Sequence, residues 1–305
     1  MENTIAINKK KKPIVTGERI FLTVMLIFPI VQFAVFYFGV NINSILLSMQ
    51  KYDKGNLVFA GFENYAKVFD DMFVNGTLAV QIKNSVIMYL VGFITLPLHI
   101  FVAYCVWKKL PFSSVFKVIL FLPNVISSIV FVSVAKYLIE LGLPTLIGNP
   151  NMPSLLDTNT NTGFMTVLIF GAWLGFAGGM VIYLSSMSSI SIDVVEYSKL
   201  DPLNFFQEFI YIVIPSIFPT ITTFVVMGIA GFFTNYGHLF SFFGGGSTTN
   251  QIETLGYRFF VILAKNPDVS LYPYCSAAGI MFSIVACPLT LLVKRAMEKY
   301  GPSED

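Results

Sequence analysis

Charged side chains, histidines and cysteines are scarce in this sequence. Asp, Glu, Lys and Arg make up 12% of its 305 residues, against about 25% in an ordinary soluble domain. The 2 histidines and 3 cysteines are too few and too scattered for a metal site or a disulfide framework. No cluster of His, Asp or Glu marks a catalytic centre near the end of an apolar run. We therefore predict that the chain is not an enzyme and holds no resident metal or cofactor.

Two further absences concern the source of energy. The phosphate-binding pattern GxxxxGK[ST] does not occur, and the glycines at 244–246 are not followed by Lys-Ser or Lys-Thr, so no ATP site of the usual kind is predicted. The apolar runs contain no paired carboxylates, which an ion-coupled or proton-coupled carrier would usually need. The small net charge of +2 gives no reason to expect a nucleic-acid partner.

Apolar residues dominate what is present. They form 55% of the chain, and the mean hydropathy is +0.73. A helix needs about 20 apolar residues to cross a hydrocarbon core of roughly 30 Å, and six runs meet this length: Ile20–Val40, Ser85–Trp107, Val115–Ile139, Gly163–Ser185, Phe209–Phe233 and Tyr272–Val293. We predict an all-α polytopic membrane protein with six transmembrane helices. The first run is too long for a removed signal peptide, so we interpret it as a retained anchor.

The distribution of Lys and Arg predicts the orientation in the membrane. With the N-terminus inside, twelve of the 19 basic residues fall on the cytoplasmic side, as the positive-inside rule favours. Residues 1–19 then form a basic cytoplasmic tail, residues 20–293 the membrane domain, and residues 294–305 a second cytoplasmic tail.

The stretch Ser191–Pro219 is the long polar segment between two apolar runs. Ser191 is suited to cap a short helix, with Asp193 in its first turn, where a carboxylate contributes about 0.3–1 kcal/mol. From composition alone, a solvated connector would be the simplest interpretation.

The spacing inside this stretch resembles the EAA loop of bacterial ATP-binding-cassette importer permeases, Glu-Ala-Ala-x3-Gly-x9-Ile-x-Leu-Pro. Glu196, Ile212 and Pro215 fall on the pattern in register, and Asp201 matches the Asp-Gly pair of the sugar-importing branch. The sequence departs from the pattern at Tyr197, Ser198, Pro202 and Ile214. Pro202 fixes φ where the family has a permissive glycine, so the turn after the loop helix is expected to differ in shape.

A second resemblance lies before the second run. Gly61, Asn64 and Tyr65, followed by Asn84-Ser85, are similar to the Gly-Leu-x-Asn-Tyr and Asn-Ser or Asn-Thr segments of sugar-importing permeases. From the residues alone, 59–71 is predicted to be an amphipathic segment with Phe62, Tyr65 and Phe69 on one face.

Together these resemblances imply the permease fold of a type I carbohydrate importer of the maltose and oligosaccharide branch, in a bacterial cytoplasmic membrane. They imply that residues of about 188–212 form a loop that docks on a separate ATPase. The implied coupling residues are Asp193, Glu196, Tyr197, Ser198, Asp201, Pro202, Ile212 and Pro215. The implied partners are a second similar permease, two ATPase subunits, an external sugar-binding protein, a carbohydrate cargo and the lipid bilayer.

Polar and aromatic residues inside the runs are candidates for the cargo path. These are Asn124, Ser127, Ser128, Trp173 and Tyr183. Serines can also satisfy backbone groups freed by Pro123, and the two aromatic residues can simply fill space, so both interpretations stay open. Gly171, Gly175 and Gly179, at intervals of four, predict a close approach by another helix. His99 is more readily explained by packing than by proton transfer.

Two alternatives remain from the sequence. The chain could be a permease of the same scaffold for another cargo, such as peptide or phosphate, although the outer-segment match and Asp201 favour sugar. It could also be a carrier or channel that works without ATP, which the absence of intramembrane acids disfavours.

Overall fold

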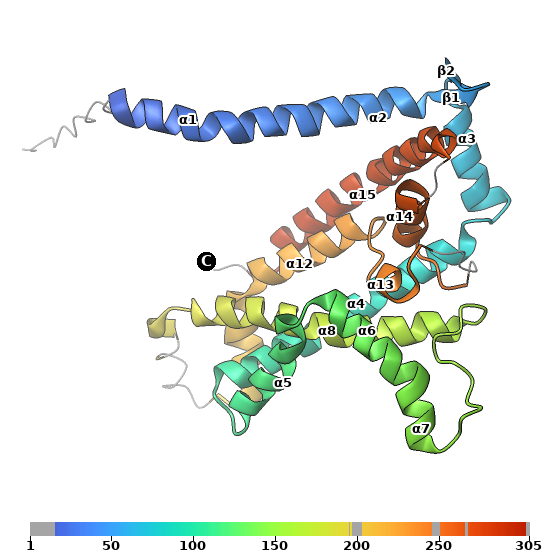
Figure 1. The fold of residues 1–305 in the computed structure, drawn as a ribbon. Helices are drawn as coiled ribbons and strands as arrows, with labels where there is room; N and C mark the ends of the chain where they lie inside the picture. Colours follow the sequence, from blue (N-terminus) through green and yellow to red (C-terminus); the bar gives the residue numbers. More distant parts are fainter. Residues whose placement is uncertain (1–15, 195, 197–202, 246–250, 266–267, 303–305) are drawn as a thin grey trace, which may run out of the picture.

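The computed structural model describes residues 16–194, 196, 203–245, 251–265 and 268–302. In these residues the chain is almost entirely helical, with one two-stranded β-hairpin (Figure 1). Five helices are long and apolar enough to cross a membrane, and a bent helix pair brings the number to six. The predicted all-α membrane fold is therefore confirmed, with a small hairpin added.

The first two runs form long helices joined by a compact connection. The helices are α1 (Thr16–Phe33), a π-helical stretch (Ala34–Gly39), α2 (Val40–Ser48), α3 (Glu63–Phe69), a second π-helical stretch (Asp70–Val74) and α4 (Ala79–Trp107). Strands β1 (Gln50–Asp53) and β2 (Asn56–Phe59) pair antiparallel between α2 and α3, with Gln50 opposite Phe59. The hairpin turn needs positive φ at Lys54 (49°) and Gly55 (86°), which glycine adopts freely and which matches the twist of the strands.

The middle of the chain contains the third and fourth runs. Its helices are α5 (Ser113–Val125), α6 (Ser128–Tyr137), a π-helical stretch (Leu138–Gly142), α7 (Leu143–Ile147) and α8 (Asn161–Ser188). The predicted single helix over Val115–Ile139 is divided, because Ile126 is extended (φ −86°, ψ 141°). The extended backbone at Ile126 and at Ser127 (φ −52°, ψ 128°) interrupts the helical hydrogen bonds between α5 and α6. The membrane-length helix here is Ser128–Ile147.

The last third contains the bent pair and the long final helix. Its elements are α10 (Phe205–Glu208), a π-helical stretch (Phe209–Val213), α11 (Ile214–Ser216), α12 (Phe218–Gly231), α13 (Leu239–Phe243), α14 (Leu255–Lys265), a 3₁₀ turn (Val269–Leu271) and α15 (Tyr272–Tyr300). The segment Phe205–Ser216, which we call the elbow, meets α12 at an angle of 68°. Pro219 cannot donate to the carbonyl of Pro215, so the helix opens at Ile217 (φ −101°, ψ 6°).

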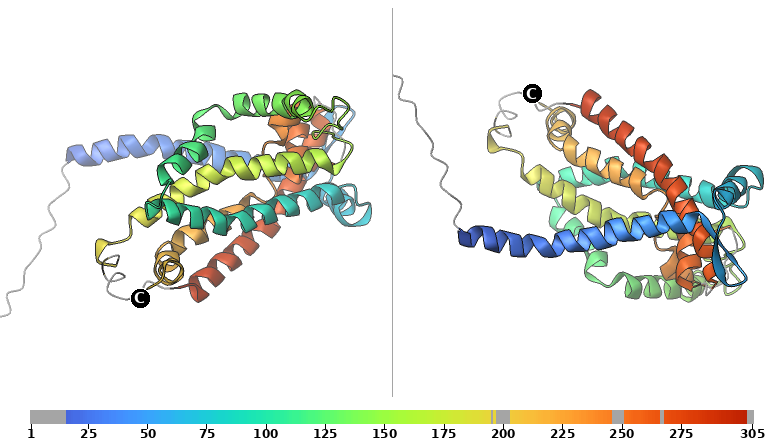
Figure 2. Two further views of the ribbon diagram at one scale, coloured as in Figure 1. Left: turned by 90° about the horizontal axis from the view of Figure 1, so that it is seen from below. Right: turned by 90° about the horizontal axis from the view of Figure 1, so that it is seen from above.

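Helices α4, α8, α12 and α15 form the body of the molecule, and α1 lies apart from it (Figures 1 and 2). The buried residues form three clusters. One of them joins the end of α4 to the end of α8 and to the elbow, through Tyr104, Met187 and Val213. We call this the loop end of the bundle, and the opposite end, beside β1 and β2, the hairpin end.

Helix α1 lies apart from the body, whereas α2 packs against α15 (Figure 1). In the 30-residue stretch Arg19–Ser48, the most apolar window has no buried side chain among those described. The contact of α2 with α15 lies near the hairpin end (Figure 1). A helix that is apolar all round and unburied is suited to lipid or to another membrane helix.

Candidate functional site

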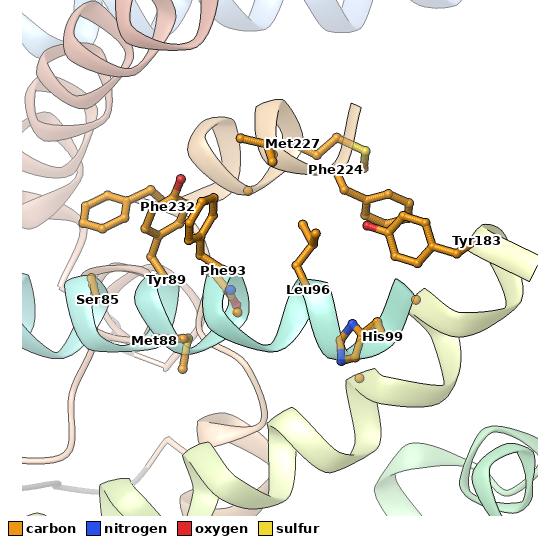
Figure 3. Close-up of a pocket in the computed structure, with 16 residues that line it drawn as sticks. Ser85, Met88, Tyr89, Phe93, Leu96, His99, Tyr183, Phe224, Met227 and Phe232 are labelled. Carbon is orange, nitrogen blue, oxygen red and sulfur yellow. The ribbon is translucent and has the colours of Figure 1, made fainter. Parts of the chain in front are cut away.

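A cavity of about 370 Å³ lies between α4, α8 and α12 (Figure 3). This volume falls within the range of about 300–1,000 Å³ that is usual for small-molecule sites. Tyr89, Phe93 and Leu96 point from α4 towards α12, which contributes Phe224 and Met227 (Figure 3). The wall is mostly aromatic and apolar, with a few polar groups.

His99 lines this cavity and also a second one of about 220 Å³ between α4 and α8. Its ring packs edge-on against Phe176, with centroids 4.5 Å apart, and its Nε2 atom is buried without a hydrogen-bond partner in the described part of the chain. The predicted packing role of His99 is thus supported by the ring contact, while the free nitrogen leaves a polar atom beside both cavities.

The predicted glycine series on α8 meets different neighbours, and Gly179 is the member that α4 approaches. A methyl group on Gly179 would lie 2.9 Å from Nδ1 of His99, and one on Gly171 would lie 3.5 Å from the ring of His238. A methyl group on Gly175 would meet no atom within 4 Å. Gly175 lines both cavities. The predicted close approach of another helix is therefore present at Gly179, and the three glycines line the cavities.

The five residues predicted for the cargo path are not brought together. Tyr183 is buried, lies 5.1 Å from the ring of Phe224 between centroids, and lines the 370 Å³ cavity. Trp173 is 44% exposed and packs instead beside Phe131. Ser127 and Ser128 are exposed at the break between α5 and α6. Asn124 lies in α5, and its side chain is outside the described residues.

The described residues of the predicted coupling loop lie at the loop end. The hydroxyl oxygen of Ser191 accepts from the backbone N–H of Val194 at 3.4 Å, so the expected helix cap is present with a long bond. Asp193 and Glu196 are helical and exposed. Ile212 and Pro215 are half-buried in the elbow. Tyr197, Ser198, Asp201 and Pro202 lie outside the described residues.

The segment at the hairpin end differs from its predicted amphipathic face. Phe62 and Phe69 are exposed, whereas Asn64 and Val68 are buried. The side-chain amide of Asn64 donates to the carbonyl oxygens of Ser48 and Gln50, at 2.8 and 2.7 Å. Tyr65 shares a hydrogen bond with Ser48 through the two hydroxyl groups, 2.7 Å apart. The short helix thus turns its polar motif residues inward, because they hold the backbone of the preceding hairpin.

Sequence reasoning missed two polar groupings, one buried and one partly buried. At the hairpin end, Gln81 on α4 donates to Glu253, which also pairs with Arg258 at 3.0 Å. At the loop end, Glu208 pairs with Lys108. Gln81 and Glu253 are about 170 residues apart in the sequence, and Lys108 and Glu208 are 100 apart. No local pattern therefore pointed to either pair. The sequence did contain one usable signal, Asn204 followed by Gln207, which forms a capping box at the start of α10.

Known proteins resemble the chain over most of its length. It is 24% identical over 250 residues to the multiple sugar-binding transport system permease protein MsmF of Streptococcus mutans, covering 80% of this chain and 83% of that protein. It is 27% identical over 237 residues to AmyD of Thermoanaerobacterium thermosulfurigenes, a probable starch degradation products transport system permease protein, covering 75% and 77%.

The match to the longer maltose/maltodextrin permease MalF of Escherichia coli is 26% identical over 196 residues and spans 38% of that protein. Among solved structures, a bacterial ABC transporter for alginate import superposes with a TM-score of 0.73 over 93% of this chain and 97% of that chain, at 18% identity. A likeness at this identity shows the fold alone.

The family model for the binding-protein-dependent transport system inner membrane component matches residues 95–302. This range contains most of the cavity wall, the elbow and the predicted coupling loop. It covers more than half of the sequence and describes a transport protein rather than a catalytic one. The chain therefore belongs to the family of binding-protein-dependent transport system inner membrane components.

Proposed function

We propose that this chain is the permease subunit of an ABC importer that carries a sugar or an oligosaccharide across the cytoplasmic membrane. The relatives that support this are permeases named for sugars, starch products and arabino-oligosaccharides. The structural observation that carries the proposal is the cavity of about 370 Å³ between α4, α8 and α12. Its aromatic faces suit the apolar faces of sugar rings, and its few polar atoms suit hydroxyl groups.

The proposed assembly contains a second similar permease, two cytoplasmic ATPase subunits and an external sugar-binding protein. One solved structure of similar fold is an alginate transporter in complex with a periplasmic protein that holds an alginate pentasaccharide. In this chain, the unburied apolar helix α1 leaves a surface for another membrane subunit. The loop of about 188–212, with Glu196 exposed, is the proposed ATPase contact. Both termini lie in the cytoplasm in this arrangement.

The test is reconstitution of the chain with its neighbouring gene products in proteoliposomes. We expect ATP-dependent uptake of a labelled oligosaccharide from a panel of maltodextrins, arabino-oligosaccharides and alginate oligosaccharides, and no uptake of peptide or phosphate. Uptake of peptide or phosphate alone would replace the sugar by another cargo. Uptake without ATP would overturn the importer.

Two neighbouring residues of α4 provide a matched test of the cavity. Phe93 lines the cavity, whereas Ile94 is 70% exposed on another face of the helix. Phe93→Ala should lower sugar uptake about tenfold if one aromatic contact contributes about 1.4 kcal/mol. Ile94→Ala should leave uptake unchanged. Equal effects of the two substitutions would move the cargo path elsewhere.

A further inference from the structure

An ion pair with low exposure joins the elbow to α4 at the loop end. Nζ of Lys108 lies 2.5 Å from Oε1 of Glu208, and the two side chains are 30% and 13% exposed. The hydroxyl of Tyr104 lies 3.1 Å from the other carboxylate oxygen of Glu208 and 3.1 Å from the carbonyl oxygen of Phe205. Both oxygens of the Glu208 carboxylate therefore have partners on α4 or on the residue that follows it.

Aromatic rings enclose this ion pair. Tyr104 is fully buried and its ring lies 4.7 Å from that of Phe205 and 4.9 Å from that of Phe209, between centroids. Phe101, one helical turn earlier on α4, stacks on Phe206 at 6.0 Å. Such packing leaves few alternative positions for either helix.

The first turn of the elbow is also held in place locally. Asn204 and Gln207 form a reciprocal capping box, in which the backbone N–H of Asn204 donates to the Gln207 side chain at 2.8 Å. The capping box fixes the position at which α10 begins. Glu208, the last residue of α10, pairs with Lys108. The attachment to α4 is made by a rigid unit rather than by a loose loop.

The two partners of this attachment lead to opposite walls of the cavity. Helix α4 continues from Tyr104 to His99, Phe93 and Tyr89, which line one wall. The elbow continues through the 68° bend at Ile217 into α12, which forms the facing wall. Glu208 also lies twelve residues after Glu196, the residue of the proposed ATPase contact.

We propose that Tyr104, Lys108 and Glu208 form a permanent latch that makes the elbow and α4 move as one body, so that displacement at the loop reaches both cavity walls. The three are positioning residues for transport. The latch rests on the proposed function in one respect, that an ATPase moves the loop. The Glu208 side chain is 13% exposed. Separation from Lys108 would leave its carboxylate poorly solvated and unpaired, which is unfavourable.

The first experiment measures the ratio of sugar transported to ATP hydrolysed in the reconstituted complex. Glu208→Gln and Lys108→Gln should each lower this ratio about threefold or more, while the ATPase subunits still co-purify. Lys109→Gln is the matched control, because Lys109 is the exposed neighbour, and it should keep the wild-type ratio. The exchanged pair Lys108→Glu with Glu208→Lys should recover the ratio in part.

Two results would overturn the latch. An unchanged ratio per assembled complex in Glu208→Gln and Lys108→Gln would reduce the ion pair to a structural contact, even if less complex were recovered. Failure of the exchanged pair to improve on either single variant would show that the pairing itself is not what matters.

The second experiment does not depend on the identity of the cargo. Lys108→Cys with Glu208→Cys, joined by a short thiol crosslinker in a background without the native cysteines, replaces the ion pair by a covalent link. We expect ATP hydrolysis stimulated by the binding protein to continue near the level of the uncrosslinked variant, because the latch does not open. Loss of stimulated hydrolysis on crosslinking, and recovery on cleaving the linker, would show instead that the two elements separate in each cycle. Absence of sugar uptake by the wild type would contradict the proposed function. The crosslinking experiment would still test the latch, because it measures ATP hydrolysis and not uptake.

Discussion

Buried amide side chains hold the hairpin end together at the scale of single residues. Asn84 on α4 donates to the carbonyl oxygens of Gln251 and Glu253, both at 2.9 Å, and Ser85 accepts from the backbone N–H of Leu255. Asn64 does the same for the β-hairpin. Asn64 and Asn84, which carried the sequence resemblance at this end, therefore hold neighbouring backbone segments in place. Each amide satisfies two carbonyl oxygens that would otherwise lack a donor.

Replacement of Asn84 tests this role. Asn84→Ala should lower the free energy of unfolding by about 1–3 kcal/mol, because it leaves two backbone carbonyls without their donor. The thermal midpoint of the purified protein in mild detergent would show this as a lower Tm. Lys83→Ala, at the exposed neighbouring position, should stay within about 0.5 kcal/mol. Equal Tm values for the two variants would remove the proposed role of the amide.

The ion pair at the hairpin predicts a pH dependence outside the membrane spans. The hydrogen bond from Lys51, followed by that from Lys67, holds the pKa of Glu63 below its usual value, and Glu63 raises the pKa of Lys51. A lowered carboxylate pKa stabilises the fold above the unfolded pKa of about 4.3, and a raised lysine pKa stabilises it below about 10.4. The pair therefore stabilises the fold between these two pH values. Its contribution is lost as the pH falls through the lowered pKa of Glu63 or rises through the raised pKa of Lys51.

Glu63→Gln should lower the Tm slightly near pH 7, and the difference from the wild type should vanish as the pH falls below 4 to 5. The effect should shrink in high salt, because both side chains are about two-fifths exposed and such pairs are screened. Tm measured against pH at two salt concentrations gives the answer. A difference that grew on acidification would have the wrong sign for this pair.

At the scale of elements, the contact of α4 with α8 depends on Gly179. Gly179→Ala would place a methyl group 2.9 Å from Nδ1 of His99, so the ring or one of the helices has to move. We expect a loss of about 1–3 kcal/mol, as for other overpacked contacts, together with lower transport because His99 lines both cavities.

Gly178 gives the matched control for this substitution. A methyl group there meets nothing within 4 Å, so Gly178→Ala should be neutral or stabilise the helix by up to about 1 kcal/mol. Tm and uptake are measured for both variants. If Gly178→Ala harmed the protein as much as Gly179→Ala, helix propensity and not the histidine contact would be responsible.

The elements also show which helix breaks could be predicted. Pro215 and Pro219 mark the bend at Ile217, since each removes a hydrogen-bond donor from the helix, and the sequence alone contained both. The break before Ser128 lies instead at extended residues after Pro123, where the sequence carried no such signal. The predicted continuous helix over Val115–Ile139 was wrong because apolar composition shows that a run can enter a membrane and not whether it is straight.

At the scale of the whole molecule, the hairpin end and the loop end should lie on opposite sides of the membrane. Lys54, in the exposed hairpin turn, and Lys299, near the end of α15, are both exposed. In intact cells a membrane-impermeant maleimide should label Lys54→Cys and spare Lys299→Cys, in a background without the native cysteines. Permeabilised cells should show labelling of both. Labelling of Lys299→Cys alone in intact cells would reverse the proposed orientation.

The sequence by itself determined the class of protein. Scarce charge, six apolar runs and the spacing of Glu196, Ile212 and Pro215 are local properties, and they were sufficient for the membrane fold and the transport family. Tertiary structure alone decided the contents of the site. The cavity wall combines Phe93, Tyr183 and Phe224 from three helices, and Glu208 meets Lys108 across 100 residues. Apolar helices can pack on many faces in lipid without a change in composition, so their partners are set by close contacts such as Gly179 with His99, which no local pattern states.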